Sequence, residues 1–277
     1  MSRNRIWLIT GASSGFGREI ARAALAAGDT VVVTARRPGV LADLADAHPD
    51  RVLALPLDVT DQAQVKTAVA DAIARFGRID VLVNNAGRAH LGAVEETSDT
   101  ELRDLMDLHF FGPAALTREV LPHMRAAQSG AIVQLTSMGG QLAFAGVGGY
   151  CAGKFALEGL TEALAQEVAP HGIKVMIVEP GAFRTNLNGA GGSVSEPLAA
   201  YDDSVGKLRV DFAAADGTQP GDPAKAADAI LTALDADRTP LRLVLGNDAI
   251  DAVLAHSEQV TADVRTWEDL GRSLDFA

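Results

Sequence analysis

Three side chains capable of proton transfer stand at a spacing that would bring them into one site. Tyr150 and Lys154 are four residues apart, so a helix would place both on one face, and Ser137 precedes the tyrosine by thirteen residues. A tyrosine and a lysine at this interval also occur by chance on many helices. The other motifs of the chain favour a proton-transfer site over a packing pattern.

A glycine-rich turn follows the first apolar segment of the chain. Residues 6–17 read IWLITGASSGFG, with Gly11, Gly15 and Gly17 between a strand-like run and a helical pattern. This order places backbone N–H groups and the positive end of a helix dipole where a phosphate can bind. The glycine spacing differs from the G-x-G-x-x-G of many dinucleotide-binding folds, and ordinary turn chemistry is the alternative.

Strands buried on both faces are expected to position these residues, because apolar, β-branched runs alternate with segments of helical periodicity. The runs are Ile6–Thr10, Val31–Ala35, Val52–Leu57, Ile79–Val83, Ala131–Thr136, Lys174–Val178 and Leu241–Leu245. Asp61 and Gly77 are expected to cap one helix, and Ser98 or Asp99 to begin a long one through Met124. The alternation predicts an α/β fold, with a doubly wound parallel β-sheet of about seven strands and helices on both faces.

The composition fits one domain spanning residues 1–277, of which 48% are apolar. A formal net charge of −12 argues against a nucleic acid or an anionic membrane as partner. The single cysteine, Cys151, excludes an internal disulfide and fits a reducing compartment. The apolar run near the N-terminus is too short for a signal sequence or a membrane span. We therefore expect a cytoplasmic protein, and we predict no metal ligands.

Two segments interrupt the alternation. Residues 186–220 contain the small-residue stretch Asn188–Ser193 and end in a turn-rich region, and loops of this length are usually functional or disordered. We expect a mobile substrate lid there, with an ordinary surface loop containing a helix as the alternative. Residues 247–277 lie beyond the last strand, and their helical pattern predicts an extension that covers the sheet edge or contacts another subunit.

Four motifs together resemble those of the short-chain dehydrogenase/reductase family in its single-domain form. They are TGASSGFG (10–17), NNAG (84–87), the Ser137, Tyr150 and Lys154 set, and PGAFRT (180–185). The resemblance spans Arg5 to about Leu245 and implies a Rossmann-like fold. It also implies hydride transfer between a nicotinamide cofactor and a carbonyl or secondary alcohol. All four motifs follow strands, at the edge of the sheet where ligands bind in doubly wound folds.

In this family pattern Tyr150 exchanges the proton with the substrate oxygen. Lys154, aided by the positive charge of the oxidised nicotinamide, would lower the tyrosine pKa by about 3 units from near 10. Lys154 would also hold the nicotinamide ribose, while Ser137 would orient the substrate oxygen. His109, in LHFFG (108–112), stands where the family usually has Asn. It is expected either to join the proton relay, adding pH dependence between about pH 5.5 and 7.5, or to be a packed residue.

The resemblance also implies a cofactor-binding set. It comprises Gly11, Ser13, Ser14, Gly15, Phe16, Gly17, Arg36, Arg37, Asp58, Val59, Asn85, Ala86, Gly87, Tyr150, Lys154, Pro180, Gly181, Phe183 and Thr185. Arg36 and Arg37 stand where a carboxylate would hold the ribose 2′-hydroxyl of NAD, so they favour NADP(H) over NAD(H) unless they merely occupy a solvated turn. Asp58 could equally serve the start of the following helix.

The residues expected around the substrate are mostly apolar. They are Met138, Gln141, Leu142, Phe144, Phe183, Leu187, Tyr201 and Phe212, with Arg88, His90 and Arg184 near the rim. This lining favours a hydrophobic ketone, aldehyde or secondary alcohol. A catalytically silent NADP-sensing regulatory protein is the alternative function. The resemblance further suggests a homodimer or homotetramer built on the long helices.

Overall fold

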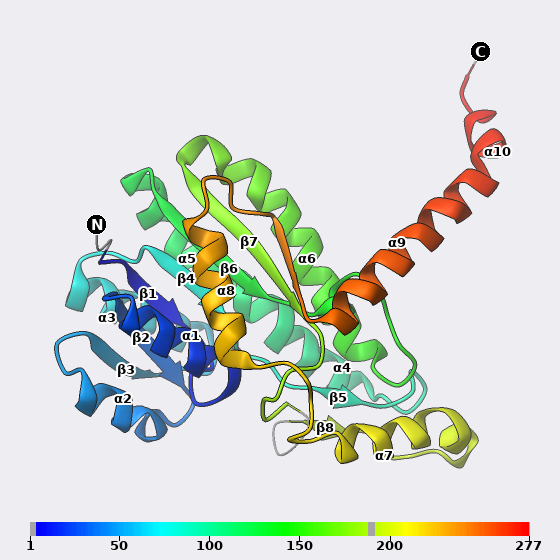
Figure 1. Cartoon of the computed structure of the whole chain (residues 1–277), viewed down its shortest axis with the longest axis horizontal. Helices are drawn as coiled ribbons and strands as arrows, with labels where there is room; N and C mark the ends of the chain where they lie inside the picture. Colours follow the sequence, from blue (N-terminus) through cyan, green and yellow to red (C-terminus); the bar gives the residue numbers. More distant parts are fainter. Residues whose placement is uncertain (1–3, 188–191, 277) are drawn as a thin grey trace.

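Seven parallel strands form one sheet in a computed structural model that describes residues 4–187 and 192–276. The strand order is β3-β2-β1-β4-β6-β7-β9 (Figure 1). Consecutive strands run outward in opposite directions from the β1–β4 pair, and in such sheets a crevice opens there at the carboxyl ends of the strands. The predicted doubly wound α/β sheet is confirmed.

The strands lie within two residues of the predicted apolar runs. They are β1 Ile6–Ile9, β2 Thr30–Ala35, β3 Val52–Pro56, β4 Val81–Asn84, β6 Gly130–Leu135, β7 Ile173–Pro180 and β9 Arg242–Leu245. Side chains alternate between two apolar cores, with Trp7 and Ile9 in one and Leu8 in the other. The runs are continuously apolar because both faces of the sheet are buried.

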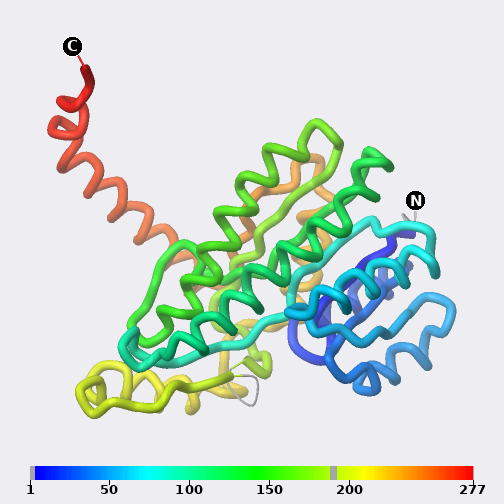
Figure 2. Tube along the Cα trace, turned by 180° about the vertical axis from the view of Figure 1, so that it is seen from behind, coloured from blue at the N-terminus to red at the C-terminus, as the bar shows by residue number. Residues whose placement is uncertain are grey.

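Helices cover the two faces of the sheet, as the views from front and back show (Figures 1 and 2). One face packs against α1 (Gly15–Ala26), α2 (Ala42–Ala47) and α8 (Pro223–Asp235). The other packs against α3 (Gln62–Phe76), α5 (Gly112–Ala127) and α6 (Gly148–Val168). The loops that carry the motifs are thus presented at one edge between two helical layers.

The helix signals of the sequence are largely confirmed. The Asp61 side chain accepts hydrogen bonds from two backbone N–H groups at the start of α3, and Gly77 ends that helix in the left-handed conformation. Ser98, rather than Asp99, begins α4 (Asp99–Met106), where it forms a reciprocal capping box with Glu101.

The long helix predicted through Met124 is interrupted, which corrects the sequence interpretation. A π-helical segment, Asp107–Phe111, separates α4 from α5. Pro113 has no backbone N–H, so the carbonyl of His109 four residues earlier lacks its usual helical donor, which favours the wider turn. Single π-turns of this kind are frequent at functional sites, and this one contains His109.

A small parallel sheet that the sequence analysis missed joins β5 (His90–Leu91) to β8 (Ser193–Val194). Two residues per strand are too few to produce a periodic signal. The expected lid includes residues 188–191, which lie outside the described residues. Beyond β8 it contains α7 (Lys207–Ala214), so the segment has helical structure of its own.

The C-terminal residues form α9 (Asn247–Thr266) and the short α10 (Glu268–Arg272). The first part of α9 packs on the body through Ala249 and Val253, and the rest projects away from it (Figures 1 and 2). Across residues 4–187 and 192–276, the structure contains no helix that is both long and apolar enough to cross a membrane.

Candidate active site

The glycine turn after β1 is shaped by contacts that exclude larger side chains. Gly11 has φ +65°, a backbone conformation that favours glycine, and a Cβ on Gly17 would lie 2.4 Å from the Asn85 Nδ2 atom and 2.7 Å from the Gly11 carbonyl oxygen. The turn leads into α1, whose N-cap residue Ser14 makes no side-chain cap hydrogen bond. The first N–H groups of α1 are therefore left to bind an anion from outside the helix.

Hydrogen bonds tie this turn to the NNAG segment after β4. The Thr10 hydroxyl accepts from the backbone N–H groups of Asn85 and Ala86, both at 2.9 Å. The Asn85 side-chain amide donates to the carbonyl oxygens of Thr10 at 2.8 Å and Gly11 at 3.1 Å. The Asn85 side chain, expected to contact the cofactor, therefore holds the turn in place. The sequence analysis gave Thr10 no role, although a hydroxyl at a strand end beside a glycine turn was the available signal.

Ser137, Tyr150 and Lys154 come together as expected. Ser137 begins the short 3₁₀ turn Met138–Gly140 after β6, and its hydroxyl accepts from the Gly139 N–H at 3.1 Å. That hydroxyl donates to the Pro180 carbonyl oxygen at 3.4 Å, and it lies close enough to the Tyr150 hydroxyl to lower the pKa of that group. One turn along α6, the Lys154 ammonium lies 5.6 Å from the centre of the Tyr150 ring and donates to the Leu135 carbonyl oxygen at 2.8 Å.

Burial controls the protonation of this group in the protein without a cofactor. It raises the pKa of Tyr150 to about 12, although the neighbouring Ser137 hydroxyl opposes the shift. Burial also lowers the pKa of Lys154 to about 8, against the attraction of Glu158. The expected lowering of the tyrosine pKa is thus not achieved by the protein groups alone, because burial disfavours both charged forms.

His109 lies beside Tyr150, with ring centres 5.3 Å apart in an edge-to-face arrangement. Its Nε2 is 3.0 Å from the Arg88 carbonyl oxygen, which can only accept, so Nε2 carries the proton. Its Nδ1 is buried and has no hydrogen-bond partner in the described structure. Burial and the nearby Lys154 charge hold the pKa of His109 well below its usual range. Burial therefore favours a neutral His109 ring, and the relay role expected of it stays a prediction.

The remaining residues of the expected cofactor set lie along the same edge. Thr185 contacts the glycine turn, 3.2 Å from the position of a Cβ on Gly15, and the Phe183 ring packs on Phe16 at 5.1 Å. Gly87 contacts His109, since a Cβ there would lie 3.1 Å from the His109 ring. The loops after β1, β4, β6 and β7 therefore converge at one edge of the sheet.

Asp58 and Val59, two residues of the expected cofactor-binding set, make contacts within the protein that could not be predicted from the sequence. The Asp58 carboxylate accepts from the N–H and hydroxyl of Thr60, while Asp61 caps α3, so Asp58 shapes the turn before the helix. Val59 is buried, and its carbonyl oxygen lies 2.9 Å from the position of a Cβ on Gly112. Arg36 and Arg37 are exposed directly after β2.

The loop at Pro180 and Gly181 is held by the C-terminal extension, through a contact that no pattern in the sequence indicates. Asp248, at the start of α9, accepts a hydrogen bond from the Ala182 N–H at 2.7 Å. A Cβ on Gly181 would lie 2.4 Å from the same carboxylate. The first turn of α9 thus helps to position the loop that carries Phe183 and Thr185.

Several residues expected around the substrate have other partners. His90, placed at the rim by the sequence analysis, is buried, and its two ring nitrogens lie 2.9 Å from the hydroxyls of Ser193 and Ser195. His90 therefore joins β5 to β8, and its ring nitrogens are not free to bind a polar group of a substrate. The Gln141 amide donates to Glu179, and the Tyr201 hydroxyl donates to Glu95 at 2.6 Å.

The other expected substrate residues keep an apolar or half-buried character. Leu142 is buried, Phe144 is exposed, and Met138, Leu187 and Phe212 are half-buried. Arg184 donates to the Gln219 carbonyl oxygen at 3.1 Å, and the Nε of Arg88 is buried without a hydrogen-bond partner in the described structure. Among Arg88, His90 and Arg184, only Arg88 has a buried side-chain polar atom without a hydrogen-bond partner in the described structure.

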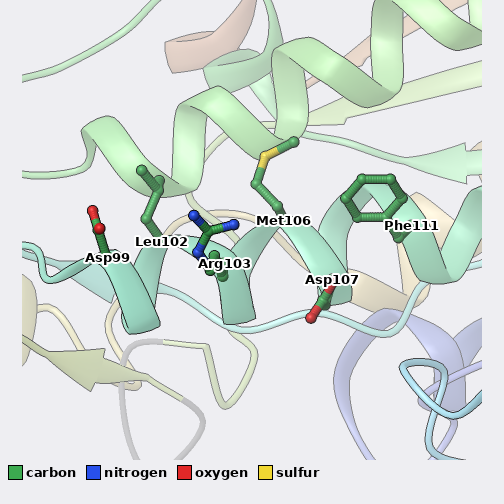
Figure 3. A pocket seen from close by; sticks show the side chains of 6 residues that line it. All are labelled: Asp99, Leu102, Arg103, Met106, Asp107 and Phe111. Carbon is green, nitrogen blue, oxygen red and sulfur yellow. The ribbon is translucent and has the colours of Figure 1, made fainter.

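A separate groove of about 380 Å³ lies along α4 and the π-helical segment (Figure 3). Its lining is Asp99, Leu102, Arg103, Met106, Asp107 and Phe111. None of the expected catalytic or cofactor-binding residues contributes to it, so this groove is distinct from the candidate active site.

The neutral state of His109 can be measured directly. In ¹⁵N NMR spectra of histidine-labelled protein, the His109 ring nitrogens should keep the shifts of a neutral ring with the proton on Nε2 from pH 7.5 down to pH 5.5. A protonated Nδ1 would be a buried donor without an acceptor. Titration with a midpoint near 6.5, as for an unperturbed histidine, would contradict this assignment.

Comparison with known proteins places the chain in a family. The family model for short chain dehydrogenases matches residues 5–193. The chain is 38% identical over 267 residues, 96% of its length, to "Oxidoreductase BOA17" of Botryotinia fuckeliana, 97% of which is covered. A crystal structure of a short-chain dehydrogenase from Streptomyces avermitilis superposes with a TM-score of 0.93 at 57% identity, covering 98% of this chain and 99% of that one.

A second similar structure was solved with a bound nicotinamide cofactor. A 3-ketoacyl-(acyl-carrier-protein) reductase from Brucella melitensis, complexed with NADH, is 27% identical with a TM-score of 0.74, and covers 88% of this chain and 98% of its own. The fold, the converging loops and these matches agree. The chain belongs to the short-chain dehydrogenase/reductase family of nicotinamide-dependent oxidoreductases.

Proposed function

We propose that this chain transfers hydride between NADP(H) and a carbonyl or secondary alcohol, with a hydrophobic ketone or aldehyde as substrate. The observation that carries the proposal is the Ser137 hydroxyl beside Tyr150, with the Lys154 ammonium one turn away and 5.6 Å from the centre of the tyrosine ring. A catalytically silent NADP sensor would have no use for this arrangement of two hydroxyls and a buried ammonium.

The crevice fits a dinucleotide on structural grounds. A Cβ at Gly17 would collide with the Asn85 side chain and the Gly11 carbonyl, so only glycine there lets the start of α1 pack against the turn. The N-terminus of α1 has no side-chain cap and offers N–H groups to a pyrophosphate. We assign these contacts to Gly11, Ser13, Ser14, Gly15 and Gly17, with Thr185 closing over the turn.

We assign Ser137, Tyr150 and Lys154 different parts in the proton transfer. When bound, the nicotinamide supplies or accepts the hydride, and in its oxidised form it adds a positive charge that favours the tyrosinate. Ser137 orients the substrate oxygen, and Tyr150 gives that oxygen a proton or takes one from it. Lys154 contributes an ammonium close enough to support the ionised tyrosine in a partly dry site.

The preference for NADP(H) rests on Arg36 and Arg37. Both guanidiniums are exposed after β2, where a carboxylate would be needed to hold the 2′-hydroxyl of NAD. Asp43, the nearby acidic residue on α2, is paired with Arg18. A 2′-phosphate would therefore meet two available cations at this turn.

The substrate side is proposed to be apolar, with residues 192–220 of the expected lid as its cover. That segment is anchored to the body by Glu96, since Leu198 N–H donates to its carboxylate at 2.8 Å and Arg209 pairs with the same group. We also propose that the protein forms a homo-oligomer through two long helical stretches, one running from α4 through the π-helical segment into α5 and the other being α6. Phe111 on the first and Phe155 on the second are exposed.

Turnover should depend on the Tyr150 hydroxyl. With NADPH absorbance as the readout and a panel of apolar ketones and aldehydes, Tyr150→Phe should lower kcat by about 10²–10⁴-fold while NADPH binding persists. Cys151→Ala, at the next position of α6, should retain turnover because its thiol takes no part in the chemistry. Tight NADPH binding by the wild type without turnover on any panel member would favour the sensor.

Cofactor choice should depend on Arg36. Arg36→Asp should weaken NADPH binding about tenfold or more, by losing a charge-assisted contact to the 2′-phosphate, and should shift preference toward NADH. Arg265→Asp on the projecting α9 makes the same change of charge and serves as the control. Titration by cofactor fluorescence measures both, and unchanged NADPH affinity in Arg36→Asp would refute the assignment.

A further inference from the structure

A buried cluster of charged side chains lies beneath the candidate active site. Glu158 on α6 is 3% exposed, and Glu179 on β7 is fully buried. Arg242 on β9 reaches both, with its Nη2 at 3.1 Å from Glu158 and its Nε at 3.0 Å from Glu179. Glu162, one turn after Glu158 and half exposed, pairs with the same guanidinium at 2.6 Å.

The charges of this cluster do not balance if every carboxyl is ionised. Three carboxyls then face two cations, the Arg242 guanidinium and the Lys154 ammonium, and Glu158 and Glu179 are both buried. Two buried carboxyls in contact cannot both ionise without a large cost, so such a pair retains a proton. Burial, followed by the charge of Glu158, raises the pKa of Glu179 to about 7, and burial raises the pKa of Glu158 as well.

The two carboxyls hold both ends of the turn that carries Ser137. Before the turn, the Thr136 hydroxyl donates to Glu158 at 3.0 Å. After it, the Gln141 amide donates to Glu179. Between them, a Cβ on Gly140 would lie 2.1 Å from the Glu158 carboxylate, so the turn rests directly on that side chain.

Glu158 also faces Lys154, because the two stand four residues apart on α6. Its charge raises the pKa of Lys154 against the lowering caused by burial. The charged groups around the pair are therefore Lys154 and Glu162 from α6 and Arg242 from β9. From α9, Asp248 bonds the Ala182 N–H just beyond β7.

We propose that Glu158 and Glu179 share one proton and that in this state they position Ser137 and Lys154 for the reaction. Neither carboxyl exchanges a proton with the substrate; both act through the groups they hold. This inference rests on the proposed function, because the reaction in question is the hydride transfer proposed above. The shared proton and the effect of Glu158 on Lys154 can nevertheless both be measured without turnover.

The shared proton should appear in the pH dependence of stability. Since the folded-state pKa of Glu179 is raised above that of the unfolded chain, its contribution is fully present below about pH 4.5 and is lost as the pH rises through about 7. Between pH 5 and 8 the wild-type melting temperature should therefore fall by at least about 2 °C more than that of Glu179→Gln, which cannot ionise. Glu162→Gln should retain the wild-type slope.

The support of Lys154 should appear in its own titration. By NMR of ¹³C-labelled lysine, Glu158→Gln should lower the pKa of Lys154 relative to wild type, whereas Glu162→Gln should leave it nearly unchanged. In the enzyme assay, Glu158→Gln should lower kcat about tenfold or more with little change in KM for NADPH, because misplaced reacting groups cost rate rather than cofactor binding. Glu179→Gln, which imitates the protonated side chain, should preserve most of kcat.

These measurements separate the two proposals. Equal melting slopes in wild type and Glu179→Gln would overturn the shared proton. An unchanged Lys154 titration in Glu158→Gln, or a kcat equal to that of Glu162→Gln, would overturn the positioning role. A wild type that binds NADPH but reduces no carbonyl would overturn the proposed function alone, and the melting and NMR results would still decide the inference about Glu158 and Glu179.

Discussion

The ammonium of Lys154 is removed from water, at 5% exposure, and the structure of the site depends on how that charge is satisfied. It donates to the Leu135 carbonyl oxygen at the end of β6 and lies over one edge of the active-site crevice beside the Tyr150 ring. A buried charge without partners costs several kcal/mol. The strand end, the tyrosine and the carboxyl of Glu158 must therefore stay together for this lysine to remain buried and charged.

The sheet makes this possible because it brings distant loops to one edge. The Thr10 hydroxyl joins the loops after β1 and β4, and the turn at Ser137 follows the neighbouring β6. Beneath that turn, Glu158 and Glu179 replace the water that polar groups at a strand end would otherwise bind. Each loop is thus held by hydrogen bonds from an adjacent element, which keeps the reacting groups in fixed relative positions.

Local features of the sequence predicted much of this arrangement. The seven strands were visible as apolar runs because both faces of the sheet are buried, and the Tyr150–Lys154 interval was visible because helical spacing puts both on one face. The caps at Asp61 and Gly77 were predicted for the same reason: capping depends on residues only a few positions apart.

Features that depend on the folded environment were not predictable in this way. The raised pKa of Tyr150 and the neutral His109 follow from burial, which no spacing in the chain reveals. The partners of His90 and the contact of Asp248 with the Pro180 loop join residues about 100 and 66 positions apart. The π-helical segment at His109 could have been suspected from Pro113, yet helical periodicity on both sides concealed it.

In the function proposed above, hydride passes from the nicotinamide to a carbonyl carbon held beside Ser137 and Tyr150. The most direct test supplies NADPH carrying deuterium at both C4 positions with a reducible ketone and analyses the product by mass spectrometry and NMR. Direct transfer should give an alcohol with one deuterium on its carbinol carbon. An alcohol without deuterium at that carbon would contradict it.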